Sequence, residues 1–429
     1  MIWKFLKKSP DKTPTESSTP AATVNQLPLS YLQKLIPLGD LPAADLLAIP
    51  VTMRNFNPGD IIFNRGAEAE QLSYLYTGNV YLEANNGAGY TVEANTFKAC
   101  YPLATSGEHA FSAIAKSPTQ IIYMPLSNLQ HSSKPINNPL INPESIPPKL
   151  RDSFFFDSFC DAFRADNLHV PSLPDVALRL RSALQKDISI ADAVKILNLD
   201  PVISSKLIQV ANSPIYRGSN PITSSHDAVN RLGFKTTQNL VTSISLHQLF
   251  RSRNRHLNNI IQTLWKQSIQ IASLSHTLAG LTRKVNADEA LLAGLIHNIG
   301  ALPIVTFAET IDISRYTEDE LQASIACLQG LLGTYILKKW HFPDSFQQIP
   351  INTTNWYFDD GQGLQLYDVV LLAKFHSQLG GANTQKLPPL NTLPAFQKLD
   401  DSALTPDMSL KALRDAKQQI AEAINFFRT

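Results

Sequence analysis

The stretch Asp200-Pro-Val-Ile-Ser-Ser-Lys-Leu-Ile-Gln-Val-Ala-Asn-Ser-Pro214 decides the fold of the larger part of the chain. An aspartate followed by proline is a strong helix start, because the carboxylate caps free backbone amides and proline needs no amide at the first helical position. Apolar residues recur along one face of the stretch, and Pro214 cannot continue a helix. The sequence therefore predicts a capped amphipathic helix that ends at Asn212-Ser-Pro214.

Helical patterns extend on both sides of this stretch. Ser189-Ile-Ala-Asp192 forms a capping box ahead of another apolar run. A helix that starts near Ser224 should stop at Leu232-Gly233, where the glycine can adopt a left-handed conformation. Another helix is expected over about 237–250, and helical sequence continues to about residue 380. We therefore expect an all-helical module over residues 153–380.

Ahead of this module the apolar pattern changes to period two. Short apolar runs are separated by Gly- and Asn-containing turns, which is typical of strands in a small β-roll or barrel. The strand candidates are Asp60–Phe63, Leu72–Tyr76, Val80–Leu82, Tyr90–Val92 and Ile121–Met124. Two short helices are expected between Tyr31 and about Val51. The fold class is therefore α+β and multidomain, with an N-terminal β-roll over 29–130.

The remaining segments lack the pattern of a packed core. Residues 1–28 are expected to form a flexible tail, because 9–26 are rich in Ser, Thr, Pro and Ala. Residues 131–152 are rich in proline and are expected to form an extended linker. Residues 381–429 are interpreted as a loose stretch followed by a helix over about 409–427.

The composition limits the class of protein. The 429 residues carry a formal net charge of +1, so no electrostatic field for nucleic acid is expected. Three well-separated cysteines, Cys100, Cys160 and Cys327, fit reduced thiols in a cytoplasmic protein better than a disulfide framework. The sequence has no run of about 18 apolar residues, so no transmembrane helix is expected. The basic and apolar start, residues 1–8, could touch a membrane surface, but an ordinary chain start is the simpler interpretation.

The stretch Phe56-Asn-Pro-Gly-Asp-Ile-Ile-Phe, continuing to Val80, resembles the opening strands of the cyclic nucleotide-binding domain family. The resemblance implies a β-roll whose phosphate cassette offers a Gly-Glu pair to the ribose and an arginine to the cyclic phosphate. Here Tyr101-Pro102 stands at the expected Gly-Glu position, His109 stands at the arginine position, and Gly107-Glu108 is displaced. Without a guanidinium to donate two parallel hydrogen bonds, this degenerate cassette of Glu108 and His109 is not expected to bind a cyclic nucleotide.

The helical module resembles the HDOD domain family of bacterial signalling proteins. The resemblance rests on Asp200-Pro201, on Ala211-Asn-Ser-Pro214, on Ala228-Val-Asn-Arg-Leu-Gly233 and on Leu292-Ala-Gly-Leu-Ile-His-Asn-Ile-Gly300. It covers about residues 155–380. It implies an all-helical fold related to HD-type metal phosphohydrolases, in a family that mostly lacks their catalytic residues.

The resemblance also implies where metal ligands would stand. A divalent metal needs several His and Asp ligands that converge from separate helices, and asparagine offers only a neutral carbonyl. The matching positions hold Gln267, His297-Asn298, Gln329, Thr353-Thr354 and Lys374. Only His297 keeps a ligand type, and Lys374 places a cation where a metal would sit. We interpret Gln267, His297, Asn298 and Lys374 as a vestigial pocket, with no catalytic residue, metal or other cofactor expected.

Two classes of function follow from these observations. The first is a non-enzymatic bacterial regulator or adaptor that acts through protein–protein contacts of the HDOD-like module, with a degenerate sensory β-roll. The alternative is a metal-dependent phosphohydrolase or nucleotide-responsive enzyme with an atypical metal site. Metal content distinguishes them, because a hydrolase of this kind must bind a divalent metal. The partner protein is not identified by the sequence, and nucleic acid is disfavoured by the near-zero net charge.

Overall fold

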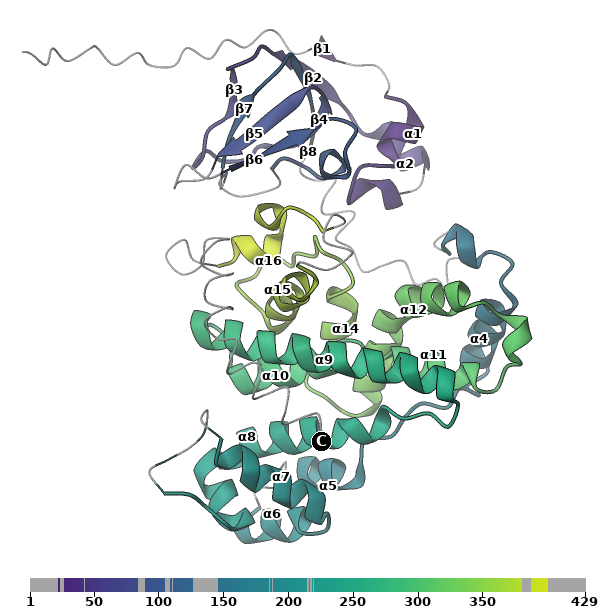
Figure 1. The fold of residues 1–429 in the computed structure, drawn as a ribbon, viewed down its shortest axis with the longest axis vertical. Coiled ribbons are helices and arrows are strands. Elements are labelled where there is room, and N and C mark those ends of the chain that lie inside the picture. The colour runs from purple at the N-terminus through teal and green to yellow at the C-terminus, as the bar shows by residue number, and fades with distance from the viewer. Residues whose placement is uncertain are drawn as a thin grey trace, which may run out of the picture. The chain divides into compact units, whose positions relative to one another are not determined.

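The computed structural model divides into two compact units, residues 1–129 and 130–429 (Figure 1). The structure describes residues 22–23, 27–41, 43–83, 89–104, 109, 111–125, 146–184, 186, 188–213, 216, 218, 220–379 and 387–399. The predicted linker core at 131–145 and the predicted helix at 409–427 lie outside the described residues, as does Glu108.

The N-terminal unit contains two antiparallel four-stranded sheets, as expected for a β-roll. One sheet has the strand order β1-β2-β8-β4 and the other β3-β7-β5-β6. The strands are β1 (Ala22–Thr23), β2 (Thr52–Phe56), β3 (Ile61–Phe63), β4 (Gln71–Thr77), β5 (Asn79–Glu83), β6 (Gly89–Glu93), β7 (Ser112–Ala115) and β8 (Thr119–Pro125). Short helices accompany them: α1 (Leu29–Leu32), α2 (Ala43–Ala48), and the 3-10 helices η1 (Leu38–Asp40) and η2 (Phe97–Cys100).

Alternating side chains build the interior of this unit. Val80 pairs with Val92 on one side and with Ala115 on the other, so one face of the second sheet is apolar. Gly59, Gly66 and Gly78 have φ values of +94°, +78° and +89°. These are the turns that the sequence predicts, and glycine adopts such values without steric cost.

The five strands expected from period two are present as β3, β4, β5, β6 and β8, whereas β1, β2 and β7 were not predicted. The boundary at residue 28 needs a correction. Ala22 pairs with Met53 and Thr23 with Thr52, and Leu27 belongs to the core. Part of the expected tail therefore belongs to the fold: residues 22–23 form a strand and Leu27 packs in the core. The sequence does not reveal the strand, because it pairs through backbone hydrogen bonds to the edge of β2 and has no apolar pattern of its own.

The C-terminal unit is helical. Its α-helices are α4 (Phe154–Arg164), α5 (Asp175–Leu184), α6 (Ile190–Leu197), α7 (Pro201–Ala211), α8 (Ser225–Leu246), α9 (Arg255–Thr282), α10 (Ala287–Ile296), α11 (Ala301–Ala308), α12 (Glu318–Lys339), α13 (Asp344–Gln347), α14 (Ile349–Asn352), α15 (Leu366–Gln378) and α16 (Pro394–Gln397). Its 3-10 helices are η4 (Pro148–Leu150), η5 (His247–Leu249), η6 (Ile313–Arg315) and η8 (Leu390–Thr392).

Local caps start these helices where the sequence places them. The Asp200 carboxylate accepts hydrogen bonds from the amides of Val202 and Ile203, at 2.9 and 3.1 Å. Ser189 caps α6 by accepting from the Asp192 amide. Gly233 has φ +76° and ψ 166° inside α8, so α8 is two helices joined directly at this glycine. The second helix therefore begins earlier than the predicted residue 237, since no loop separates it from the first.

The long helix α9 packs against α10 and α15, and α12 packs against α11 and α14 (Figure 1). Glycines allow these close contacts: a Cβ on Gly294 would lie 2.4 Å from Ala272 Cα, and one on Gly300 would lie 2.0 Å from the Gln329 carbonyl oxygen. Among the described residues, one stretch, Ala287–Ala308, is apolar and long enough to span a membrane. Most of its residues are buried within the fold, as expected for core helices.

The segment predicted as loose also needs a correction. Residues 387–399 pack on the helical unit, and Leu387, Leu393 and Ala395 belong to its core. The prolines mislead here because Pro394 stands at the start of α16, where proline is tolerated.

Candidate functional site

His297 lies at the C-terminal end of α10 and is 8% exposed. Its Nδ1 lies 2.7 Å from the Gly294 carbonyl oxygen, an acceptor, so Nδ1 carries the proton and Nε2 keeps the lone pair. Burial, together with the nearby Lys374 ammonium, lowers the pKa of His297 to about 4, against the opposing effect of the Gly294 bond. His297 is therefore a neutral imidazole at physiological pH.

Asn298 is held by polar groups of α9. Its Oδ1 lies 2.8 Å from the Ser268 hydroxyl, and its Nδ2 donates to the Leu264 carbonyl oxygen at 3.3 Å. Ser268 Oγ also lies 2.9 Å from that carbonyl oxygen. The amide of Asn298 thus joins α9 to the turn after α10. Sequence reasoning missed Ser268 as its partner, since a serine on an apolar helix gives no signal of a contact 30 residues away.

Lys374 projects from α15 into the same region. Its Nζ donates to the Thr353 carbonyl oxygen at 2.9 Å and lies 5.3 Å from the centre of the Trp356 ring. Burial lowers the pKa of Lys374 to about 8. An ammonium with one hydrogen bond and an aromatic face is a partly compensated buried cation. The structure thereby brings together His297, Lys374 and Thr353.

The other matched positions have different surroundings. The Thr353 hydroxyl donates to the Ile349 carbonyl oxygen at 2.8 Å, and the Thr354 hydroxyl donates to that of Ile351 at 2.6 Å. Gln329 is half-buried, and its carbonyl oxygen would lie closest to a Cβ placed on Gly300. Both threonine hydroxyls therefore donate to carbonyl oxygens of their own helix, and not to one shared group.

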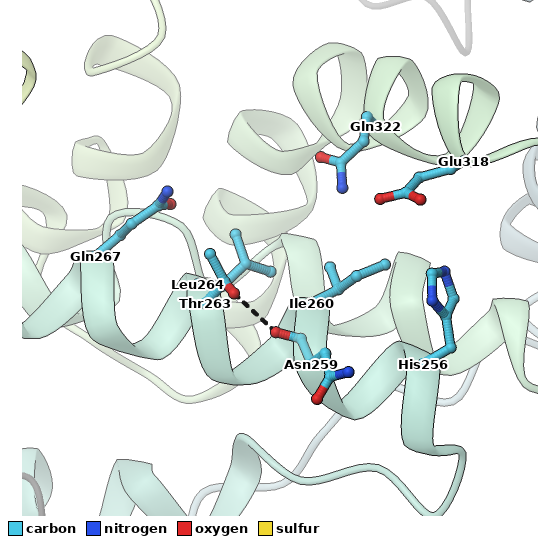
Figure 2. A pocket seen from close by; sticks show the side chains of 8 residues that line it. All are labelled: His256, Asn259, Ile260, Thr263, Leu264, Gln267, Glu318 and Gln322. Carbon is cyan, nitrogen blue, oxygen red and sulfur yellow. Dashed lines mark hydrogen bonds between the residues drawn. The ribbon is translucent and has the colours of Figure 1, made fainter. Parts of the chain in front are cut away.

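Gln267 takes part in a different feature of the surface. It is exposed on α9 and lines a separate pocket of about 280 Å³ between α9 and the start of α12 (Figure 2). Figure 2 shows Gln267 at one end of this pocket and His256 with Glu318 at the other. The remaining lining residues are Asn259, Ile260, Thr263, Leu264 and Gln322. Of the predicted vestigial pocket, Gln267 thus lines a space whose lining includes neither His297 nor Lys374.

The donor set does not fit a divalent metal. Within the described residues, no group of three or more His, Cys, Asp or Glu side chains is placed to hold a metal ion. His297 could offer one nitrogen, Asn298 Oδ1 faces the Ser268 hydroxyl, and Lys374 brings positive charge that a metal would have to oppose. A catalytic metal needs at least three protein ligands and one open coordination position for water or substrate.

In the β-roll, His109 takes the place expected for a phosphate-binding arginine. Its ring stacks on Phe63 with centroids 4.1 Å apart, and burial lowers the pKa of His109. Its Nδ1 is buried without a hydrogen-bond partner in the structure. Tyr101 and Phe111, from the same stretch, are buried as well. At the described positions of this stretch, Tyr101, His109 and Phe111 thus present aromatic rings, and none of these three side chains is a fixed cation.

The family model for the HDOD domain matches residues 170–354. The chain contains an HDOD domain. The match runs from the loop before α5 to the residues just after α14, and α15 with Lys374 lies beyond it. The chain also matches an uncharacterized protein of Treponema pallidum (strain Nichols), with 24% identity over 191 residues. That match covers 41% of this chain and about a third of the other protein's length, 36%.

Solved structures resemble both parts of the chain. A protein of Shewanella amazonensis SB2B, provisionally named a metal-dependent phosphohydrolase, is 26% identical with a TM-score of 0.54 and covers 63% of this chain and 97% of its own. A protein of Marinobacter aquaeolei VT8, provisionally named a signal transduction protein, is 18% identical with a TM-score of 0.47 and covers 72% and 74%. For the β-rich region, a protein of Geobacter metallireducens GS-15, provisionally named a cyclic nucleotide-binding protein, is 19% identical with a TM-score of 0.21 and covers 25% and 83%.

Proposed function

We propose that this protein is a non-enzymatic cytoplasmic regulator whose HDOD domain acts by binding another protein. The presence of the HDOD domain supports a regulatory role. The proposal that the protein is not an enzyme rests on the position of Lys374. Its ammonium donates to the Thr353 carbonyl oxygen and lowers the pKa of His297. A fixed cation in the pocket replaces the charge that a metal would supply, but it has no open coordination position to activate water.

A regulator that binds a partner needs the packed fold of the domain but not the metal ligands of an active site. The helix caps, the glycine contacts and the apolar core are intact, while the hydroxyls of Thr353 and Thr354 bond to carbonyl oxygens of their own helix. Catalysis requires convergent ligands, whereas a scaffold requires only a stable surface. The arrangement of Asn298, Ser268 and Leu264 is of this second kind, because it joins two helices without leaving a free ligand atom.

The alternative is a metal-dependent phosphohydrolase with an atypical site. The name of the Shewanella amazonensis protein favours it. Such an enzyme would have to recruit ligands other than the matched residues, and His297 would be its best ligand through Nε2. His297→Ala would then abolish hydrolysis of phosphate esters in the presence of Mn²⁺, whereas a scaffold has no such activity to lose.

An exposed apolar corner offers a place to test the contact with a partner. Leu199 and Val202 flank the start of α7 and are 59% and 62% exposed. Exposed single apolar residues are ordinary, but two large ones beside one helix start are a candidate contact. Asp200 between them is needed for the cap, so it is left unchanged in the test.

The experiment compares full-length variants in native cells that lack the wild-type protein. We expect His297→Ala to restore the cellular effect, and the double variant Leu199→Ser, Val202→Ser to reduce it. Gln209→Ser, on the exposed side of the same helix, is the matched control and should behave as wild type. Loss of the effect in folded His297→Ala would show that the pocket works chemically or binds a ligand, and would overturn the proposal.

For the β-roll we propose that it does not bind cyclic AMP or cyclic GMP. The stacked, neutral His109 offers no charge-assisted contact to a cyclic phosphate. Calorimetric titration of the full chain with either nucleotide should show no saturable heat. A micromolar dissociation constant that is lost on His109→Ala would contradict this.

A further inference from the structure

Residues 387–399, called the strap below, lie on the helical unit as a separate piece of chain. The strap contains η8 and α16, and α16 packs against α15. Leu393 and Ala395 are buried, and the Thr392 hydroxyl lies 3.0 Å from the hydroxyl of Tyr357. The strap also lies beyond the region that the HDOD family model matches, which ends at residue 354. It packs on the unit through buried apolar side chains and a few polar contacts.

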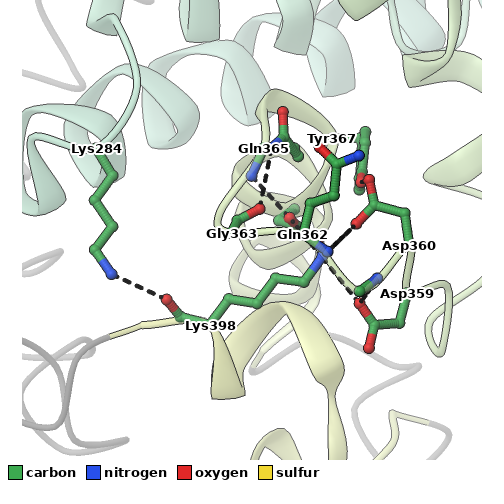
Figure 3. A network of polar contacts seen from close by, with 10 residues as sticks. Lys284, Asp359, Asp360, Gln362, Gly363, Gln365, Tyr367 and Lys398 are labelled. Carbon is green, nitrogen blue, oxygen red and sulfur yellow. Dashed lines mark hydrogen bonds and ion pairs between the residues drawn. The ribbon is translucent and has the colours of Figure 1, made fainter.

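Lys398, one residue before the end of the strap, is its polar anchor. Its Nζ lies 3.1 Å from Asp359, 3.3 Å from Asp360 and 3.2 Å from the nearer oxygen of Asp368. These three aspartates are called the cradle below. The Lys398 side chain is 10% exposed, and Figure 3 shows it directed at Asp359 and Asp360, with Lys284 donating to the Lys398 carbonyl oxygen.

The cradle carries more negative charge than Lys398 balances. Three carboxylates surround one ammonium, and Asp368 is 1% exposed, so its charge depends on this neighbour. Burial raises the pKa of Asp368 to about 6 even though Lys398 opposes the shift. Other donors also face the cradle: the Tyr367 hydroxyl donates to Asp360, and the backbone amides of Gly361, Gln362 and Gln365 donate to Asp359, Asp360 and Asp368 respectively. A lysine is therefore the side chain that this surface is built to accept.

We propose that the strap occupies, in cis, a peptide-binding surface of the helical unit, and that a partner segment with apolar anchors followed by lysine replaces it. The inference rests on the proposed function, because it names the chemistry of the protein that the HDOD-containing unit binds. The strap has the form of such a peptide: buried Leu393 and Ala395 are followed by Lys398 in the cradle. Charge complementarity selects the lysine, and the apolar anchors supply the contact area.

The occupied surface should bind a partner weakly until the strap lifts. A site that is covered most of the time has an apparent affinity reduced by the fraction of time that it is open. Breaking the Lys398 contacts should therefore increase the affinity of the helical unit for a separate peptide with similar apolar and lysine residues. If the strap has only a structural role, this affinity should not increase.

The test uses the full-length chain and a fluorescent peptide with the sequence of residues 387–399 as the probe. Hydrogen exchange first compares wild type with Lys398→Glu, and we expect faster exchange of the strap and of α15. Fluorescence anisotropy should then show the peptide binding Lys398→Glu about tenfold or more tightly than wild type, since the site is uncovered. A peptide that carries Lys398→Glu should bind neither protein.

Lys398→Arg is the matched control and should keep both slow exchange and weak peptide binding, because arginine preserves the charge. If Lys398→Glu does not fold, Lys398→Gln replaces it. A strap that exchanges quickly without any peptide binding, or a strap unchanged by either substitution, would overturn the proposal. Neither readout involves hydrolysis or metal, so a failure here is distinct from a failure of the proposed function.

Discussion

His297 and Lys374 share one pocket, and the charge of the lysine affects the protonation of the histidine. Burial is the larger cause of the low pKa of His297, and the Lys374 ammonium adds to it. The pocket therefore holds one positive charge at neutral pH, on Lys374. This arrangement lets the His297 ring lie in a packed interior, because the imidazole is neutral and bonded to Gly294.

Removal of the lysine charge should raise the pKa of His297. In Lys374→Met the ammonium is absent and burial remains, so we expect a pKa above about 4 but below the ordinary value of 6.5. NMR titration of the His297 ring measures it. Lys374→Arg, which keeps the charge, should leave the pKa low. A pKa that is the same in wild type and in Lys374→Met would show that the two groups are not coupled.

The low pKa of His297 also makes stability depend on pH. Between about 4 and 6.5 the unfolded chain binds a proton at this position and the folded chain does not, so folding stability falls as the pH is lowered through this window. In His297→Gln this contribution is absent. When the pH is lowered from 6.5 to 4, the free energy of unfolding of the variant should therefore fall by up to about 3 kcal/mol less than that of the wild type.

The comparison between the two proteins isolates His297 from other groups. Burial shifts the pKa of His376 in the same direction and that of Asp368 in the opposite direction, but both are present in wild type and variant. Urea unfolding at a series of pH values gives the difference. Equal pH dependence in the two proteins would contradict the buried, neutral state of His297.

At the scale of elements, glycines at helix contacts hold the domain together. Gly294 on α10 allows α9 to approach so closely that a Cβ would lie 2.4 Å from Ala272 Cα. Gly280, on α9, has nothing within 4 Å of such a Cβ. The two helical glycines differ in surroundings, which makes them a matched pair.

Alanine should therefore have opposite effects at these two positions. Gly294→Ala forces α9 and α10 apart and should destabilise the fold by about 1–3 kcal/mol or more. Gly280→Ala should stabilise it by roughly 0.5–1 kcal/mol, because alanine favours an exposed helix. Thermal and urea unfolding measure both. Destabilisation of similar size in the two variants would mean that the close helix contact is not the cause.

The sequence predicted elements well where the signal is local and poorly where it is tertiary. The caps at Ser189 and Asp200 were predicted because a side chain bonds to amides a few residues away. The strap was predicted as loose, since nothing in its prolines reveals that Leu393 is buried against distant helices. At the candidate site, the Lys374 ammonium acts on His297, Gln267 lines another pocket, and the contact of Ser268 with Asn298 was not predicted because it joins residues 30 positions apart.

At the scale of the whole molecule, the chain joins a β-roll to a helical unit that contains an HDOD domain. Each unit has its own apolar core, two clusters in the roll and one large cluster in the helical unit. A core of that size should fold without the other unit.

A fragment of residues 146–429 should therefore unfold cooperatively, with a denaturant midpoint close to that of the corresponding transition in the full chain. Circular dichroism at 222 nm during urea unfolding measures it, with the full chain as the control. A fragment that shows no cooperative transition would mean that the helical unit depends on the roll for its stability.

The central claim, that the HDOD-containing unit works by binding and not by metal-dependent turnover, is tested most directly by metal content. The full-length chain is incubated with Mn²⁺, Fe²⁺, Ni²⁺ and Zn²⁺, dialysed, and measured by inductively coupled plasma mass spectrometry. We expect less than about 0.1 ion of each metal per chain, because the matched positions offer one histidine where several ligands are needed. One or more ions per chain that remain after dialysis and are lost in His297→Ala would contradict the account.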